Sequence, residues 1–236
     1  MGILPLTKEH KNYVIEFDAH KVIRPTELPV EKLGAVFIET GGAHPENREE
    51  MARFLHDLVE HAHYIANDHN NEQKGAIQRI LEIVQRARTS GTEIWFVDIE
   101  TTNEEVVREL RTSKHRITRP IREYASYWLA RRGNATRRKV SRYLIKRLEA
   151  ASTIGQLREL TINEKIRLLS EKSGHNNIGI FVGAAHAGLE DIIKKGLKLN
   201  EEQKRELAKK GAHALKAYRC IYDSQAGNWR VEEHSL

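Results

Sequence analysis

The first hundred residues alternate between short apolar runs and amphipathic stretches. Residues 14–19 (VIEFDA) and 35–40 (AVFIET) predict short strands, and the near-continuous apolar run of the second is typical of a sheet buried on both faces. Residues 45–67 and 72–89 carry apolar positions at helical spacing, which predicts two helices. The second helix is expected to stop at Ser90-Gly91, and the segment GTEIWFVDIE that follows predicts a strand ending in acidic residues.

The pattern changes in the second half of the chain. Residues 104–172 are almost wholly helical in pattern, and the apolar run NNIGIFVG (176–183) then returns to a strand. One helix is expected to begin near Leu189, and another is expected over residues 199–215. The C-terminal segment AYRCIYDSQAGNWRVEE predicts a β-hairpin that turns at Gly227.

The order strand, helix, helix, strand favours the α/β class. We therefore expect one domain over residues 1–236, with a largely parallel central sheet flanked by helices, a helical insertion at about 104–172 and a C-terminal β-hairpin. The helical segment fits two arrangements: helices packed beside the sheet, or an Arg-rich insertion that forms a lid.

Composition narrows the class of protein. The chain has 236 residues, is 39% hydrophobic and has a mean hydropathy of -0.60, values typical of a water-soluble protein. No run approaches the roughly 20 apolar residues of a membrane span, and the N-terminus lacks the pattern of a secretory signal. A single cysteine, Cys220, excludes an intramolecular disulfide. These features predict a cytoplasmic protein that does not enter membranes.

Positive charge is concentrated in one part of the chain. Lys and Arg together number 39 against 33 Asp and Glu, and the excess lies between Arg116 and Arg147. The stretch ARRGNATRRKVSRYLIKR contains no carboxylate, so it creates a positive potential that attracts phosphates or acidic substrates. A solvated helix face is the alternative. The candidate substrate-binding residues are Arg131, Arg132, Arg137 and Arg138.

Two histidines follow predicted strands in the same way. Gly183-Ala-Ala-His186 comes directly after one apolar strand, and Gly41-Gly42-Ala43-His44 comes directly after another. Parallel α/β sheets place ligands beyond the carboxyl ends of their strands, and small residues there let a ligand approach the backbone. The alternative for each histidine alone is a side chain that caps a helix or bonds its own loop.

Carboxylates occupy equivalent positions. Glu39 closes the strand that leads to His44, and Asp98 and Glu100 close the third predicted strand. If these strands are neighbours and run the same way, two imidazoles and up to three carboxylates converge on one rim. Such a set suits a divalent metal ion or acid/base hydrolysis.

The paired motifs resemble the superfamily that joins TraB pheromone-shutdown proteins, Tiki metalloproteases, ChaN-like haem-binding lipoproteins and erythromycin esterases. Three short segments carry the resemblance: VFIETGGAHPENREEMARFL, WFVDIETTNEE and FVGAAHAGLEDII. It implies hydrolysis in which His44, His186 and a carboxylate, Glu100 or Glu39, bind a metal or activate water. The sequence departs from the family's pattern at two points. Glu39 lies further from His44 than in the Gly-Glu-x-His spacing of the esterases, and the position of the family's arginine is not matched directly, Arg48 being one candidate.

Other residues compete as candidates. Metal ligands could also come from one helix, where His56, Glu60 and His63 lie near one face and Asp57 and His61 lie on another, although such residues are usually solvated. The remaining candidates are His20 after the first strand, Cys220 as a small buried residue, and the aromatic pair Tyr127 and Trp128, which suits helix packing better than base stacking.

Two functions therefore stay open at this point. In the first, the protein is a hydrolase with its site at the strand rim, and the basic helices recruit an anionic substrate. In the second, the protein binds a nucleic acid or nucleotide through the basic helices of residues 116–147, and the histidines are structural.

Overall fold

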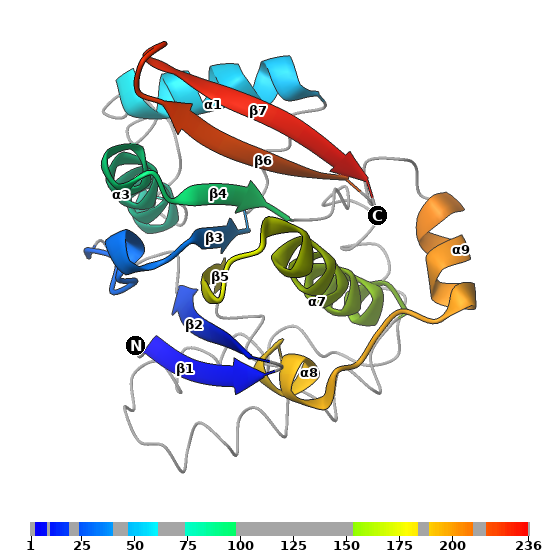
Figure 1. The fold of residues 1–236 in the computed structure, drawn as a ribbon. Helices are drawn as coiled ribbons and strands as arrows, with labels where there is room; N and C mark the ends of the chain where they lie inside the picture. The colour runs from blue at the N-terminus through cyan, green and yellow to red at the C-terminus, as the bar shows by residue number, and fades with distance from the viewer. Residues whose placement is uncertain are drawn as a thin grey trace.

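The chain folds around one seven-stranded sheet, seen in a computed structural model (Figure 1). The structure describes residues 3–8, 10–18, 24–39, 47–60, 74–97, 153–183, 189–209 and 216–235. The strands are β1 (Ile3–Lys8), β2 (Lys11–Asp18), β3 (Ala35–Ile38), β4 (Glu93–Phe96), β5 (Asn177–Gly183), β6 (Lys216–Asp223) and β7 (Asn228–Ser235). Their order across the sheet is β1-β2-β5-β3-β4-β6-β7.

The sheet is mixed, so the prediction of a largely parallel sheet is wrong. The four central strands β2, β5, β3 and β4 are parallel, but β1 pairs antiparallel with β2, and β6 is antiparallel to both β4 and β7. Only two residues separate β1 from β2 and four separate β6 from β7, and so short a connection permits only antiparallel pairing. The N-terminal edge strand ILPLTK was not predicted at all.

Helices cover both faces of the sheet. The short helix η1 (Val30–Lys32), α1 (Arg48–Glu60) and α3 (Lys74–Ser90) pack on one face. On the other face lie α7 (Thr153–Ser173) and α8 (Leu189–Lys195), and α9 (Glu201–Lys209) follows them in the chain (Figure 1). The predicted helical insertion is confirmed only for its last part, α7, because residues 98–152 lie outside the described residues.

Local signals place several element ends as expected. The N–H of Gly91, at φ +75°, bonds the Ala87 carbonyl where α3 ends, and Gly227, at φ +68°, lies in the turn of the β6–β7 hairpin. The C-terminal hairpin is therefore confirmed. Within the helix predicted over 45–67, α1 begins at Arg48. The Asn47 side chain accepts a hydrogen bond from the Glu50 N–H at 2.9 Å and so caps the start of this helix.

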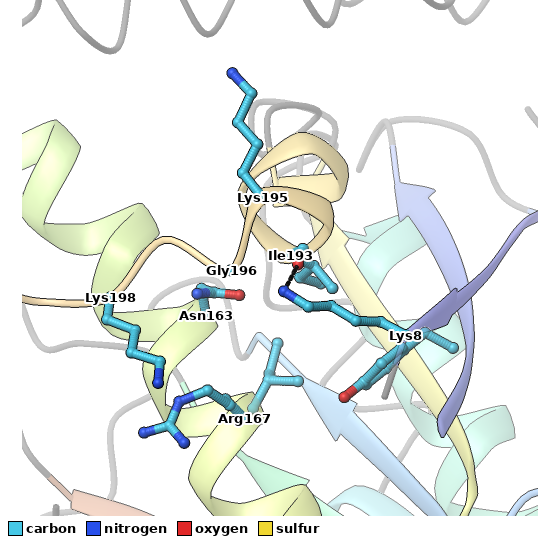
Figure 2. Close-up of a pocket in the computed structure, with 9 residues that line it drawn as sticks. Lys8, Asn163, Arg167, Ile193, Lys195, Gly196 and Lys198 are labelled. Atoms are coloured by element: carbon cyan, nitrogen blue, oxygen red, sulfur yellow. Dashed lines mark hydrogen bonds between the residues drawn. The ribbon is translucent and has the colours of Figure 1, made fainter. Parts of the chain in front are cut away.

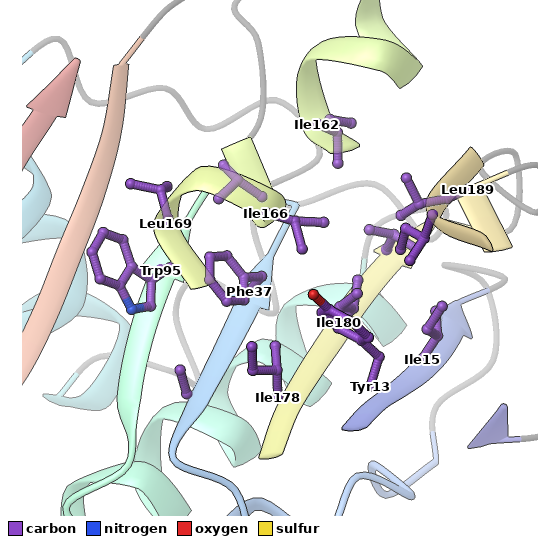
Figure 3. Close-up of a cluster of buried hydrophobic side chains, with 14 of the residues drawn as sticks. Tyr13, Ile15, Phe37, Trp95, Ile162, Ile166, Leu169, Ile178, Ile180 and Leu189 are labelled. Carbon is purple, nitrogen blue, oxygen red and sulfur yellow. The ribbon is translucent and has the colours of Figure 1, made fainter. Parts of the chain in front are cut away.

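The core under α7 and α8 fills one face of the central strands. Ile162, Ile166 and Leu169 of α7 lie over the side chains of β3, β4 and β5 (Figure 3). Phe37 and Trp95 stack there with ring centroids 5.8 Å apart. Burying each large apolar side chain contributes about 1.5–3 kcal/mol, so this layer holds α7 against the parallel strands.

The second core lies under α1 and α3. Met51, Leu55 and Leu58 of α1 pack with the buried face of α3 against alternate residues of the same strands, such as Val36 and Ile38. Alternation of this kind explains why β3 is apolar at every position: both of its faces are covered. None of the helices in the described part of the chain is long and apolar enough to cross a membrane.

Candidate active site at the carboxyl edge of the sheet

The three strands that lead to the predicted site residues lie side by side. β3 pairs with β4 and with β5, and all three run in the same direction. Their carboxyl ends, at Ile38, Phe96 and Gly183, therefore reach the same edge of the sheet. The strands predicted in the runs 35–40, 91–100 and 176–183 therefore share one sheet and one direction over the residues that the structure describes as β3, β4 and β5.

The carboxyl edge contains a topological switch point between β3 and β5. After β3 the next described helix is α1, which packs on the face that contains Val36. After β5 the next is α8, which packs on the opposite face with Phe37 and Ile180. Neighbouring strands whose following helices lie on opposite faces leave a crevice at their carboxyl ends, where open α/β sheets bind ligands.

Glu39 occupies this switch point. It is the first residue after β3 and its side chain is buried. The Glu39 carboxylate accepts a hydrogen bond from the Gly183 N–H at 2.7 Å, and the Glu39 N–H donates to the Phe181 carbonyl at 3.0 Å. A buried carboxylate thus joins the ends of the two strands from which both GxxH segments depart.

The other residues of the predicted site lie outside the described residues: His44, His186, Asp98, Glu100, Arg131, Arg132, Arg137 and Arg138. Of the predicted rim set, the structure therefore places Glu39 alone. Asp18, which was not predicted as a site residue, ends β2 in register opposite Gly183 and so lies at the same edge. The acidic end of the segment VIEFDA is the signal that would have found it.

Competing candidates differ in their surroundings. His56 and Asp57 are both exposed on α1, with 3.4 Å between the His56 Nδ1 and the Asp57 carboxylate, whereas His20, His61, His63, Tyr127 and Trp128 lie outside the described residues. Cys220 is fully buried in β6, where burial raises the pKa of its thiol, as expected for a small core residue. Among the described residues, His, Cys, Asp and Glu form no group of three that could hold a metal ion.

The opposite, amino edge of the parallel strands carries an ion-pair cluster. Arg219 of β6 binds Glu93, the first residue of β4, and the His175 ring lies 3.2 Å from the same carboxylate. Burial raises the pKa of Glu93, but the hydrogen bonds of Arg219 and the nearby Arg219 and His175 side chains outweigh burial and hold that pKa below its ordinary value. This carboxylate is therefore bound as an anion and has a structural role.

His234 lies in the same cluster. Its ring contacts Trp95, with centroids 5.0 Å apart, and its Nδ1 lies 3.2 Å from the Lys172 ammonium. Burial and the charge of Lys172 lower the pKa of His234, and Glu232 only partly opposes them. The folded state therefore favours the neutral ring.

In comparisons with known proteins, no family model, curated protein or solved structure matched this chain.

Proposed function

We propose that the protein is a hydrolase whose active site lies at the carboxyl edge of the sheet, between β3 and β5. One observation carries the proposal: the buried Glu39 carboxylate bonds the Gly183 N–H at a switch point of parallel strands. Its neighbours in the proposed site are His44 and His186, which follow these two strands in the sequence, and Asp98 and Glu100, which follow β4. The resemblance to the TraB and Tiki superfamily supports the same chemistry.

Chain length supports convergence of the two histidines. His44 is five residues beyond Glu39, and His186 is three beyond Gly183. Extended chain spans at most about 3.3–3.6 Å per residue, so the reach of the two segments is roughly 17 Å and 10 Å. Adjacent strands lie only about 4.8 Å apart, and both imidazoles can therefore meet at the switch point.

The proposed roles follow from the residue types. A histidine or a carboxylate takes a proton from the attacking water, and the second histidine polarises the bond that is cleaved. His44, His186 and Glu100 are the residues that would hold a divalent metal ion, which lowers the pKa of a bound water. An anionic substrate recruited by the basic segment 116–147, and a cytoplasmic location, belong to the same proposal.

Three variants test the proposal: His44→Ala, His186→Ala and the double mutant. His10→Asn is the matched control, because His10 is exposed in the turn before β2, at the opposite edge of the sheet, and Asn tolerates its φ of +65°. We expect each rim variant to lose hydrolysis of p-nitrophenyl acetate or bis-p-nitrophenyl phosphate, or to lose bound divalent metal. The double mutant should be hardly worse than either single mutant, since members of one catalytic unit are strongly non-additive.

The melting temperatures of the variants distinguish a catalytic or metal-binding role of the two histidines from a structural role. Rim histidines that face a crevice contribute few core contacts, so the variants should melt close to the wild type. A histidine that only bonds its loop would instead leave an unsatisfied partner and cost about 1–3 kcal/mol. Destabilised variants with unchanged metal content and hydrolysis would contradict the proposal, as would a wild type that neither hydrolyses these esters nor binds metal.

A further inference from the structure

A second candidate site is a pocket of about 260 Å³ between β1, α7 and the end of α8 (Figure 2). Its lining residues are Lys8, Tyr13, Asn163, Ile166, Arg167, Ile193, Lys195, Gly196 and Lys198. Lys8 pairs with Lys11 at the start of β2, so the pocket lies toward the amino edge of the parallel strands. It is therefore separate from the carboxyl edge that holds Glu39.

The lining is strongly biased toward positive charge. Four of its nine residues are cations, from β1, α7, α8 and the segment after α8, and none is a carboxylate. Figure 2 shows the charged ends of Arg167 and Lys198 pointing toward one another, whereas Lys195 extends away from them. Such a cluster favours a ligand that carries more than one negative charge.

The cations of the pocket differ in the hydrogen bonds and ion pairs that they already make within the protein. The Lys8 ammonium donates to the Ile193 carbonyl at 2.7 Å, where the end of α8 carries partial negative charge, and Arg167 is held by Glu164 at 3.0 Å and Glu171 at 3.0 Å. Lys198 is exposed and makes no hydrogen bond or ion pair with any residue in the described ranges. It is thus available to a ligand, beside an Arg that is fixed in position.

Gly196 keeps the pocket open at the end of α8. Its φ of +64° ends the helix, and its N–H bonds the Ile193 carbonyl at 3.1 Å. A Cβ at this position would lie 2.5 Å from the Lys8 Nζ. Glycine therefore serves both the helix end and the approach of the Lys8 ammonium.

Three residues that line the pocket also belong to the core beneath it. Tyr13, Ile166 and Ile193 line it and belong to the buried core of this face. The Asn163 amide donates to the Leu197 carbonyl at 2.6 Å and ties α7 to the segment that carries Lys198. The lining thus combines three largely buried core residues with four cations.

We infer that this pocket binds a small organic phosphate monoester. A monoester carries about -1.5 to -2 charge at neutral pH, which matches a multiply cationic lining better than a single carboxylate does. Arg167 and Lys198 contact the phosphate, and the organic group packs on Tyr13, Ile166 and Ile193. The volume lies just below the ~300–1,000 Å³ of typical ligand sites, which suits one compact molecule.

Titration of the isotope-labelled full chain with phenyl phosphate tests this site. We expect phenyl phosphate to shift the Gly196 and Lys198 amide signals in a saturable manner. Inorganic phosphate and benzoate should bind more weakly than phenyl phosphate. Lys198→Glu should raise the dissociation constant about tenfold, a change of about 1.4 kcal/mol. Arg205→Glu is the matched control, because Arg205 is exposed on α9, does not line the pocket and changes net charge equally.

Several outcomes would overturn the inference. They are an equal loss of affinity in both charge-reversal variants, amide shifts that leave Gly196 unchanged, equal affinity for benzoate, and tighter binding of a phosphodiester oligonucleotide than of phenyl phosphate at this site. Absence of any saturable binding by the wild type would overturn it as well. Because Lys198 is exposed, its replacement leaves the fold intact, and an unchanged melting temperature verifies this.

Discussion

Glu39 joins the ends of β3 and β5 and is also a proposed catalytic residue, and two substitutions separate these two roles. Glu39→Ala removes the acceptor that the Gly183 N–H uses at 2.7 Å. Because this hydrogen bond is buried and its loss leaves the Gly183 N–H unsatisfied, we expect the free energy of unfolding to fall by about 1–3 kcal/mol. Glu39→Gln keeps an oxygen acceptor at the same place, and we expect it to retain stability within about 1 kcal/mol.

Urea unfolding measures both variants, and ester hydrolysis is measured on the same samples. If Glu39 acts in catalysis, the Gln variant loses hydrolysis while it keeps stability, because an amide cannot take up a proton as a carboxylate does. Glu49→Ala is the control, since Glu49 is exposed on α1 and should change stability by no more than about 0.5 kcal/mol. An Ala variant as stable as the wild type would refute the reasoning about the buried hydrogen bond. A fully active Gln variant would remove Glu39 from the catalytic set.

The remaining packing predictions concern the strand that carries Gly183. Gly179→Ala in β5 would bring a Cβ within 2.6 Å of the Leu33 Cδ1, and we expect this overpacking to lower the unfolding free energy by about 1–3 kcal/mol. Leu33→Ala alone should cost about 2–5 kcal/mol, because Leu33 is buried. The double mutant should be more stable than the sum of the two losses, and strict additivity in urea unfolding would show that these side chains do not meet.

Apolar runs predicted the central strands because burial on both faces removes polar residues from every position. Val36 and Phe37, for example, face opposite cores, so β3 reads as a strand without any alternation. Local glycines fixed the ends just as directly, as at Gly91 and Gly227, where positive φ favours glycine. Features that depend on adjacent residues were therefore predictable.

Edge strands were predicted less well because their direction depends on distant partners. The strand β1 carries Pro5, which is tolerated at a sheet edge but weakens a strand pattern. The hairpin turn at Gly227 predicts that β6 and β7 pair, but it contains no information that β6 joins β4 in the antiparallel sense. The cationic pocket was not predicted for the same reason. Its residues Lys8, Arg167 and Lys198 are far apart in the sequence, and each one alone has the pattern of an ordinary surface cation.

The ion-pair cluster at the amino edge predicts how stability responds to acid. The pKa of Glu93 is lower in the folded protein than its ordinary value of 4.5, and the pKa of His234 is lower than its ordinary value of 6.5. In both cases the unfolded chain binds the proton more readily, so the free energy of unfolding rises with pH between the two pKa values of each group. Acidification should therefore remove stability in two steps, first below pH 6.5 from His234 and then below pH 4.5 from Glu93.

Arg219→Gln tests the second of these steps. Without the Arg219 guanidinium, the effect of burial on Glu93 is opposed mainly by His175, so the pKa of Glu93 should rise and the stabilisation by this carboxylate at neutral pH should be smaller. We expect a loss of about 2 kcal/mol at pH 7, since the hydrogen bonds of a charged pair disappear and Arg219 is partly exposed. The difference from the wild type should shrink as the pH falls below 4.5, because the wild type then loses the stabilisation by its Glu93 carboxylate, whereas Arg205→Gln on the surface of α9 should show no such convergence. Urea unfolding of the three proteins from pH 3 to 8 measures this, and a loss for Arg219→Gln that is constant with pH would mean that Arg219 acts by packing on Trp95 and not through the Glu93 carboxylate.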